Sequence, residues 1–272
     1  MTWELKNSTE LADGIVRWDT LGEGSPIVLV HGTPYSSFLW RDVAVALARH
    51  GREVYVFDHL GYGLSEQREG QDLTLAAQGR NFAELLRRWK LERPSVVACD
   101  IGGAIALRTL LLEGASYSDL TLFDAVTGGA WELGLFALIR QHHEVFAQLP
   151  AYAHKALVTA HLRNGTRQGY RPGVLETYLA PWLGAQGQAA FYRQYRQLSP
   201  DDTADYEHLL GTIDIPVTLL WGSEDQILPT PYGEWIEQRI PNHGLTWIDG
   251  AGHLLPEDAP AQLIERLTQQ SD

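Results

Sequence analysis

Short apolar runs alternate with longer amphipathic stretches along most of the chain, and this alternation restricts the fold more than any other feature. Two of the runs, residues 27–30 and 96–98, are continuously apolar, which is typical of parallel strands covered on both faces. We expect strands at Ile27–His31, Glu53–Asp58, Ser95–Cys99, Leu120–Asp124, Pro216–Trp221 and Leu245–Asp249. We expect helices at Phe38–His50, Thr74–Lys90, Gly103–Glu113, Pro231–Arg239 and Ala259–Gln270. The pattern predicts an α/β fold, with a mostly parallel central sheet flanked by helices.

The alternation stops between residues 127 and 213. This stretch holds several helical patterns and many aromatic residues, and no run in it has the character of a strand. Prolines divide it at Pro150, Pro172, Pro181 and Pro200. We therefore predict an inserted helical lid, or cap, at residues 127–213, and a core formed by residues 1–126 and 214–272.

The composition is that of a globular protein and disfavours several classes of function. Of the 272 residues, 44% are hydrophobic and 20% are charged. The net charge of −13 argues against binding to nucleic acid, because phosphate contacts need clustered Lys and Arg. Cys99 is the only cysteine, so neither an intrachain disulfide nor a cysteine-based metal site can form. No histidine pattern predicts a metal site either.

The N-terminal residues lack the basic and apolar segments of a signal peptide. No apolar run approaches the ~18 residues needed to span a bilayer. We therefore expect a cytoplasmic protein without a membrane partner. The sequence leaves the oligomeric state open, with a homodimer as one option.

Residues 96–104, Val-Val-Ala-Cys-Asp-Ile-Gly-Gly-Ala, predict a strand that enters a sharp turn and then a helix. A nucleophile elbow has this shape and needs small residues two positions before and after the nucleophile. Centred on Asp100, the pattern places Ala98 and Gly102 at those positions, whereas centred on Cys99 it would place two branched residues there. We predict that the turn presents Asp100. The alternative role for Asp100 is an N-cap of the following helix.

Two further residues complete a triad in the order nucleophile, acid, histidine, which is the order of the α/β-hydrolase triad. His253 ends the glycine-rich segment 249–253 after the last expected strand, and Asp225 follows the preceding expected strand. Carboxyl ends of strands are where open α/β sheets place their sites. We expect Asp100 to be the nucleophile, His253 the base and Asp225 the acid that supports it. Glu224 and Asp124 are the alternative acids.

The segment His31-Gly32-Thr33-Pro34 resembles the oxyanion loop of the same fold. The backbone N–H groups of Thr33 and Ile101 are expected to hold a developing oxyanion. A carboxylate nucleophile forms an ester with an sp³ carbon that bears a strained oxygen or a halide, and water activated by His253 then cleaves that ester. Attack on a carboxylic ester would instead give a labile anhydride, which disfavours ordinary esterase or lipase activity.

Together these motifs resemble the Asp-nucleophile branch of the α/β-hydrolase superfamily over nearly the whole chain. The branch contains epoxide hydrolases, haloalkane dehalogenases and haloacetate dehalogenases, and the resemblance implies a hydrolase without a cofactor. Haloalkane dehalogenases carry side-chain N–H donors for halide where this chain has Thr33 and Ile101. Haloacetate dehalogenases carry two arginines where this chain has Ile101 and Ala104. Neither set of dehalogenase ligands is matched.

Epoxide hydrolases donate a proton to the opening ring from lid tyrosines, one of which lies in an aromatic-Tyr-Arg sequence. Phe191-Tyr192-Arg193 matches that sequence, so the resemblance implies Tyr192 as a proton donor. His142 and Tyr152 lie near the place expected for the first donor. The alternative role for Tyr192 is packing of a lid helix.

The leading hypothesis is an epoxide hydrolase that acts through an ester on Asp100, with a small, largely apolar organic substrate. A haloalkane or haloacid dehalogenase is the nearest alternative. An alternative of another class is a binding protein, or a biosynthetic lyase or isomerase that uses His253 alone. A binding protein needs no base, so the complete triad argues against it.

Overall fold

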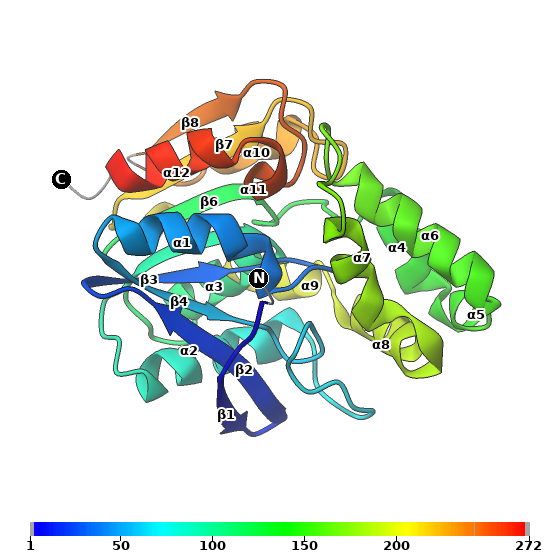
Figure 1. The fold of residues 1–272 in the computed structure, drawn as a ribbon. Helices are drawn as coiled ribbons and strands as arrows, with labels where there is room; N and C mark the ends of the chain where they lie inside the picture. The colour runs from blue at the N-terminus through cyan, green and yellow to red at the C-terminus, as the bar shows by residue number, and fades with distance from the viewer. Residues whose placement is uncertain (1–2, 242, 270–272) are drawn as a thin grey trace.

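The computed structural model describes residues 3–241 and 243–269, which form a single eight-stranded sheet with helices on both faces (Figure 1). The strand order is β1-β2-β4-β3-β5-β6-β7-β8. The strands are β1 (Asn7–Leu11), β2 (Gly14–Leu21), β3 (Ser25–Val30), β4 (Arg52–Phe57), β5 (Ser95–Asp100), β6 (Leu120–Ala125), β7 (Val217–Gly222) and β8 (His243–Ile248). From β4 onward in this order, every neighbouring pair is parallel. The predicted α/β class with a mostly parallel sheet is confirmed.

Helices cover both faces of the sheet, with α1 beside α12 on one face and α2 beside α3 on the other (Figure 1). The core helices are η1 (Ser37–Trp40), α1 (Arg41–Arg49), α2 (Leu75–Arg88), α3 (Ile101–Leu111), α10 (Pro231–Glu237), α11 (Leu255–Asp258) and α12 (Pro260–Gln269). Local chemistry sets these boundaries: α2 begins after Thr74, whose hydroxyl accepts the Ala77 N–H at 3.1 Å. Each expected core helix is present within a few residues of its predicted range. Gln270 of the last expected helix lies outside the described residues.

Between β6 and β7 the chain is helical, and the segment extends beyond the carboxyl ends of the strands (Figure 1). Its elements are α4 (Gly134–Gln141), α5 (His143–Ala147), α6 (Ala151–Asn164), α7 (Val174–Leu179), η2 (Ala180–Trp182), α8 (Gly184–Gln197), α9 (Asp201–Glu207) and η3 (Leu210–Thr212). The last α-helix of this segment, α9, lies against α2 and α3 of the core, where Arg108 Nη1 donates to the Asp202 carbonyl at 2.8 Å. Within the described ranges, no helix is both long and apolar enough to cross a membrane.

The sheet begins with an antiparallel hairpin that the sequence analysis missed. Strand β1 pairs antiparallel with β2, and β2 pairs antiparallel with β4. The prediction started the sheet at residue 27, because β2 has no continuous apolar run. Val16 of β2 is buried whereas its neighbour Ile15 is 43% exposed, so only one face of this edge contributes to the core.

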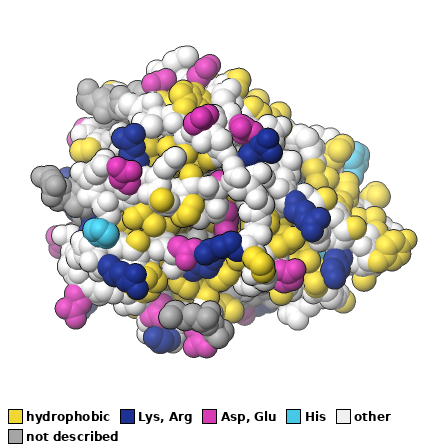
Figure 2. Space-filling view, turned by 45° about the horizontal axis from the view of Figure 1, so that its top comes forward, with side chains coloured by type: hydrophobic (Ala, Val, Ile, Leu, Met, Phe, Trp, Pro, Cys, Tyr) yellow, Lys and Arg dark blue, Asp and Glu magenta, His cyan; other side chains and the backbone are white. Residues whose placement is uncertain are grey.

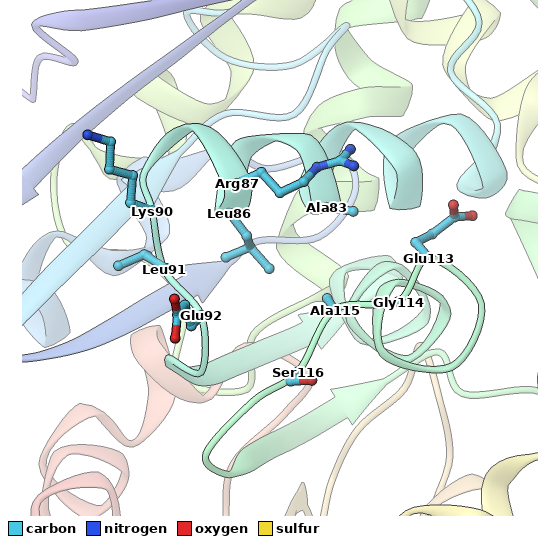
Figure 3. A pocket seen from close by; sticks show the side chains of 10 residues that line it. All are labelled: Ala83, Leu86, Arg87, Lys90, Leu91, Glu92, Glu113, Gly114, Ala115 and Ser116. Carbon is cyan, nitrogen blue, oxygen red and sulfur yellow. The ribbon is translucent and has the colours of Figure 1, made fainter.

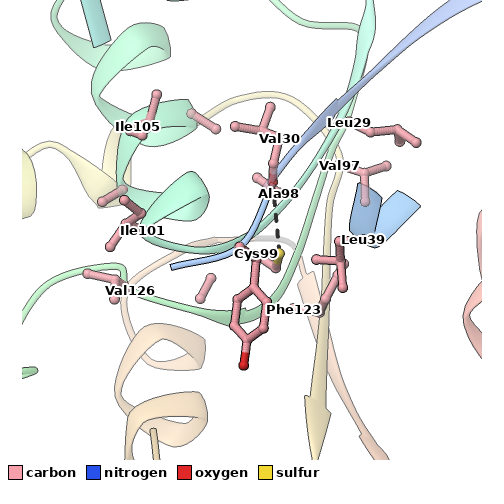
Figure 4. Packing of buried hydrophobic residues seen from close by; sticks show 14 of the residues in the cluster. Leu29, Val30, Leu39, Val97, Ala98, Cys99, Ile101, Ile105, Phe123 and Val126 are labelled. Carbon is pink, nitrogen blue, oxygen red and sulfur yellow. Dashed lines mark hydrogen bonds between the residues drawn. The ribbon is translucent and has the colours of Figure 1, made fainter. Parts of the chain in front are cut away.

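Buried side chains from β3, β5, β6 and α3 meet beneath the turn that joins β5 to α3 (Figure 4). Cys99 belongs to this core: its thiol is buried and donates to the Val30 carbonyl at 3.9 Å. Gly102 lies so close to β3 that a Cβ there would be 2.6 Å from the carbonyl oxygens of Val30 and His31. The sharp turn therefore depends on a residue without a side chain at position 102.

Substituting Gly102 with Ala should destabilise the fold. The added methyl group meets backbone atoms, which cannot rotate away, so we expect a loss of about 1–3 kcal/mol in the free energy of unfolding. Urea denaturation measures the change. Gly244→Ala is the matched control, because a Cβ at Gly244 would meet no atom within 4 Å. Equal stability of the two variants would contradict the close packing inferred for the turn.

Candidate active site

Asp100 is the last residue of β5 and immediately precedes α3, in a strained backbone conformation. Its φ of 50° and ψ of −134° lie outside the regions that non-glycine residues usually adopt. The side chain makes no capping hydrogen bond to α3, so the alternative of an ordinary N-cap is not what the structure shows. A Cβ on Gly32 would lie 2.3 Å from the Asp100 Cβ, so the loop after β3 runs directly against the carboxyl group. Backbone strain of this kind concentrates at functional sites.

The three predicted triad residues lie together at the carboxyl ends of β5, β7 and β8. The Nε2 atom of His253 is 3.3 Å from Asp100 Oδ2, and its Nδ1 atom is 2.9 Å from Asp225 Oδ2. The other oxygen of Asp225 accepts the backbone N–H groups of Ile227 at 2.7 Å and Leu228 at 3.0 Å. All three triad side chains are buried. The imidazole is thus held between two carboxylates, one at each nitrogen.

The charges of these carboxylates set the protonation of His253. Burial alone would lower the pKa of His253. The charges of Asp225 and Asp100, and the hydrogen bonds that His253 makes with both, outweigh the effect of burial and raise that pKa well above its usual value. The two carboxylates therefore favour the imidazolium form of His253. If the charge of Asp100 is removed, His253 loses one of the two groups that hold its proton.

The backbone N–H of Thr33 donates to Asp100 Oδ1 at 2.6 Å, so the segment predicted as the oxyanion loop does meet the carboxylate. Ile101 is the first residue of α3, and an N–H at that position has no acceptor within its helix. The loop is also tied to the segment between β6 and β7: Thr33 Oγ1 donates to Gln194 Oε1, and Trp182 Nε1 donates to the Pro34 carbonyl, both at 2.8 Å. These bonds fix the position of the Thr33 N–H.

The two alternative acids have different surroundings. Glu224 is paired with Arg167 away from the imidazole, and the hydrogen bonds and ion pairs of the described residues do not join it to His253. Asp124, at the end of β6, is fully buried and accepts the Gly222 N–H at 2.7 Å. It lies beside Asp225. Of the three candidate acids, Asp225 is the one that contacts Nδ1 of His253.

A cavity of about 210 Å³ opens over Asp100 between the sheet edge and the helical segment. Its walls are largely apolar, and its polar lining is confined to a few groups. The apolar lining residues include Ile101, Val126, Trp131, Leu133, Leu135, Phe136, Ile227, Leu228 and Pro229. The polar ones are Thr33, Asp100, His161, Asn164, Tyr195 and Gln226. A space of this size and polarity suits a small organic molecule.

Tyr195 of α8 and His161 of α6 form a hydrogen-bonded pair in the wall of this cavity. The Tyr195 hydroxyl lies 2.6 Å from His161 Nε2. Burial, with the nearby charge of Asp100, raises the pKa of Tyr195 well above its usual value, so the hydroxyl keeps its proton. Burial also lowers the pKa of His161 to about 4, so this histidine is neutral at pH 7. The pair is a neutral proton-donating group in the same cavity as Asp100.

The three residues expected to act as proton donors, Tyr192, His142 and Tyr152, do not line the cavity. The Tyr192 hydroxyl is bound to His154 Nδ1 at 2.9 Å, inside the packing between α6 and α8. His142 lies at the exposed junction of α4 and α5, and Tyr152 is 79% exposed on α6. Hydrophobic side chains are visible on the end of the molecule formed by the helical segment between β6 and β7, at the right of Figure 2. The motif points to Tyr192, whereas the tyrosine of α8 that lines the cavity is Tyr195, three residues later.

A second hollow, of about 480 Å³, lies between the end of α2 and the loop that follows α3 (Figure 3). Arg87, Lys90, Glu92 and Glu113 line it, with several small and apolar residues. It adjoins the segments that lead into the amino ends of β5 and β6, whereas Asp100 is at the carboxyl end of β5. The hollow therefore lies at the amino ends of the strands, opposite the carboxyl ends where the triad lies.

Comparison with known proteins identifies the family to which this fold belongs. The sequence profile described as the alpha/beta hydrolase fold matches residues 25–260. The chain belongs to the α/β-hydrolase fold family. Haloalkane dehalogenase 2 from Mycobacterium tuberculosis (strain ATCC 25618 / H37Rv) is 28% identical over 264 residues, which cover 93% of this chain and 91% of that protein.

Two solved structures extend the comparison. An α/β-hydrolase fold protein from Burkholderia ambifaria is 41% identical, with a TM-score of 0.94 and 98% of each chain covered. The haloalkane dehalogenase DatA from Agrobacterium tumefaciens C58 is 22% identical, with a TM-score of 0.83 and coverage of 97% of this chain and 94% of that one, and this likeness concerns the fold alone. This α/β-hydrolase chain is thus an enzyme of the hydrolase class.

Replacing Asp100 with Asn should lower the pKa of His253. The carboxylate favours the imidazolium by its charge and its hydrogen bond, and the neutral amide removes the charge. His253 should then lose its proton at a lower pH than in the wild type. An NMR titration of the histidine ring measures the shift. Glu224→Gln removes a carboxylate paired with Arg167 and is the control; an unchanged pKa in Asp100→Asn would contradict the assigned contact.

Proposed function

We propose that this chain is an epoxide hydrolase that needs no cofactor, with Asp100 as nucleophile, His253 as base and Asp225 as its supporting acid. The observation that carries the proposal is the pair formed by Tyr195 and His161, which faces the same small cavity as Asp100. A nucleophile and a neutral proton donor in one apolar cavity suit the opening of a strained ether, where the carbon is attacked and the oxygen must be protonated.

In the first step, an Asp100 oxygen attacks one ring carbon and the bond from that carbon to the epoxide oxygen breaks. The ring oxygen takes a proton from the Tyr195 hydroxyl. His161, which is hydrogen-bonded to Tyr195, stabilises the Tyr195 phenolate that remains. The geometry favours Oδ2 as the attacking oxygen, because Oδ1 is held by the Thr33 N–H. The product of this step is a hydroxyalkyl ester on Asp100.

In the second step, water attacks the ester carbonyl carbon of Asp100 and gives a proton to His253. Esterification removes the charge of Asp100, so the pKa of His253 falls and the ring gives its proton through solvent to the Tyr195 phenolate. This transfer restores the Tyr195 hydroxyl and leaves His253 neutral, so that the ring can act as a base. The N–H groups of Thr33 and Ile101 would stabilise the oxyanion that forms on Oδ1, each by roughly 3–4 kcal/mol. Collapse of this intermediate expels an alkoxide, which takes a proton from His253 and leaves as a vicinal diol. The new carboxyl group of Asp100 then gives its proton to His253, which restores the starting carboxylate.

Haloalkane dehalogenation is the second candidate, and the 28% identical relative from Mycobacterium tuberculosis favours it. The same ester would form, with halide as the leaving group. The side chains at Thr33 and Ile101 offer no N–H donor for halide. The indole N–H of Trp131 in the cavity wall is already bonded to Thr203 Oγ1 at 2.9 Å. These two observations favour the epoxide over the halide.

Replacing His253 with Gln should trap the ester on Asp100. The first step needs no base, whereas the second does, so a covalent adduct should accumulate when the variant meets a small apolar epoxide. Intact-mass measurement should show a gain equal to the mass of the epoxide, mapped by peptide analysis to Asp100. Bromoalkanes of similar size test the alternative, since they would leave an alkyl group and release bromide.

A single turnover of wild-type enzyme in ¹⁸O water gives an independent check. The label should enter the Asp100 carboxylate, and the diol should carry an unlabelled oxygen from Asp100. Label in the diol with none in Asp100 would mean that water attacks the substrate directly, and the ester mechanism would be wrong.

Replacing Tyr195 with Phe should lower kcat/KM for epoxides by about 10²–10⁴-fold, which is the range for loss of a proton donor. The change keeps the aromatic ring and removes only the hydroxyl. Tyr192→Phe is the matched control on the same helix, because its hydroxyl contacts His154 outside the cavity. Initial rates with one epoxide measure both variants. Similar losses in both, or a loss in Tyr192→Phe alone, would contradict the assignment of Tyr195.

A further inference from the structure

A third carboxyl group lies behind the imidazole and has no part in the proposed reaction. Asp124 is the penultimate residue of β6 and has a φ of 43°, a left-handed conformation that a non-glycine residue seldom adopts. Its side chain is fully buried, and its carboxyl group lies beside that of Asp225. The sheet therefore brings two acids, from the ends of the adjacent strands β6 and β7, to the same side of His253.

The hydrogen bonds of Asp124 account for only one of its oxygens. Oδ1 accepts the Gly222 N–H at 2.7 Å, whereas no described residue donates a hydrogen bond to the buried Oδ2. The salt bridges of the described residues do not include Asp124, so no Lys or Arg balances a charge there. A buried, unpaired carboxylate oxygen costs several kcal/mol, whereas a protonated one can act as a donor.

Asp225 supplies the matching acceptor. A carboxylate has about four positions at which it accepts hydrogen bonds. On Asp225, the N–H groups of Ile227 and Leu228 occupy positions on Oδ1, and Nδ1 of His253 contacts Oδ2. All of these are donors, so Asp225 is the ionised partner. A fourth donor can still be accepted, and the carboxyl group beside it is that of Asp124.

We propose that Asp124 is a neutral carboxylic acid that donates a hydrogen bond from Oδ2 to Asp225 and thereby holds the Asp225 carboxylate in place behind His253. Asp124 is then a positioning residue, which touches no substrate and acts through Asp225. The proposal rests on the two carboxyl groups and their donors, so it holds whichever carbon–heteroatom bond the enzyme breaks.

The electrostatic surroundings agree. Burial raises the pKa of Asp124 well above its usual value, and the charge of Asp225 acts in the same direction, whereas the charge of His253 and the Gly222 N–H act against them. Cys99, also near Asp124, is kept neutral by burial. The charged groups that face Asp124 are therefore Asp225 and His253, and burial together with the charge of Asp225 favours the protonated form of Asp124.

Two substitutions separate a neutral Asp124 from an ionised one. Asp124→Asn keeps an acceptor for the Gly222 N–H and a donor for Asp225, and it carries no charge. Asp124→Leu keeps much of the volume and removes the donor. Three NMR measurements follow the effect without substrate: the ¹³C shift of the Asp124 carboxyl carbon, the pKa of His253, and the far-downfield proton of the His253–Asp225 hydrogen bond.

The carboxyl carbon of Asp124, assigned by its loss in Asp124→Asn, should show the shift of a protonated acid across the neutral pH range. The pKa of His253 should be the same in Asp124→Asn as in wild type, because no charge is lost. The downfield proton should persist in Asp124→Asn and should disappear or exchange faster in Asp124→Leu.

Other results would overturn the proposal. A carboxylate ¹³C shift at neutral pH, or a fall in the pKa of His253 in Asp124→Asn, would mean that Asp124 is ionised. An unchanged downfield proton in folded Asp124→Leu would mean that Asp124 does not position Asp225. If Asp124→Leu does not fold, the Asn variant and the ¹³C shift still decide the matter. Failure of epoxide turnover would leave all three measurements unaffected, so the two proposals fail separately.

Discussion

The site depends on one strained residue, because the backbone of Asp100 can hold its left-handed conformation only where its neighbours leave no alternative. Strand β5 carries the residue to the sheet edge, α3 starts immediately after it, and Gly32 and Gly102 allow the β3 strand and loop to pack against the turn. Packing of the buried core holds the strain, whose cost is of order 1–3 kcal/mol. The presented carboxylate is therefore a product of the whole sheet and not of the local loop.

The central strands, and the residues that lie together at their ends, could be predicted from the sequence. Continuous apolar runs mark strands buried on both faces, and the carboxyl ends of parallel strands share an edge. With the elbow motif and the order of the α/β-hydrolase triad, this was enough to place Asp100, Asp225 and His253 together. The β1–β2 hairpin gave no such signal, because one of its faces is exposed to solvent. Its existence follows from pairing with β4, which is a long-range property.

The helical segment was harder to interpret for a different reason. A motif locates a residue along the chain, but the phase of α8 decides which side chain faces the cavity. Tyr192 and Tyr195 lie almost one turn apart, yet one binds His154 in the packing between helices and the other binds His161 in the cavity wall. That phase is set by contacts such as Gln194 with Thr33, which join residues 161 positions apart in the sequence. Sequence periodicity within α8 alone cannot supply it.

The two oxygens of Asp100 are not equivalent, and this has a consequence for the life of the enzyme. Oδ1 is held by the Thr33 N–H at 2.6 Å, while Oδ2 faces His253. In the proposed reaction, Oδ2 leaves with each product and an oxygen from water replaces it, whereas Oδ1 stays. One oxygen of the Asp100 carboxylate would therefore be replaced by an oxygen from water in every cycle. The other, Oδ1, would be the atom incorporated when the polypeptide was synthesised.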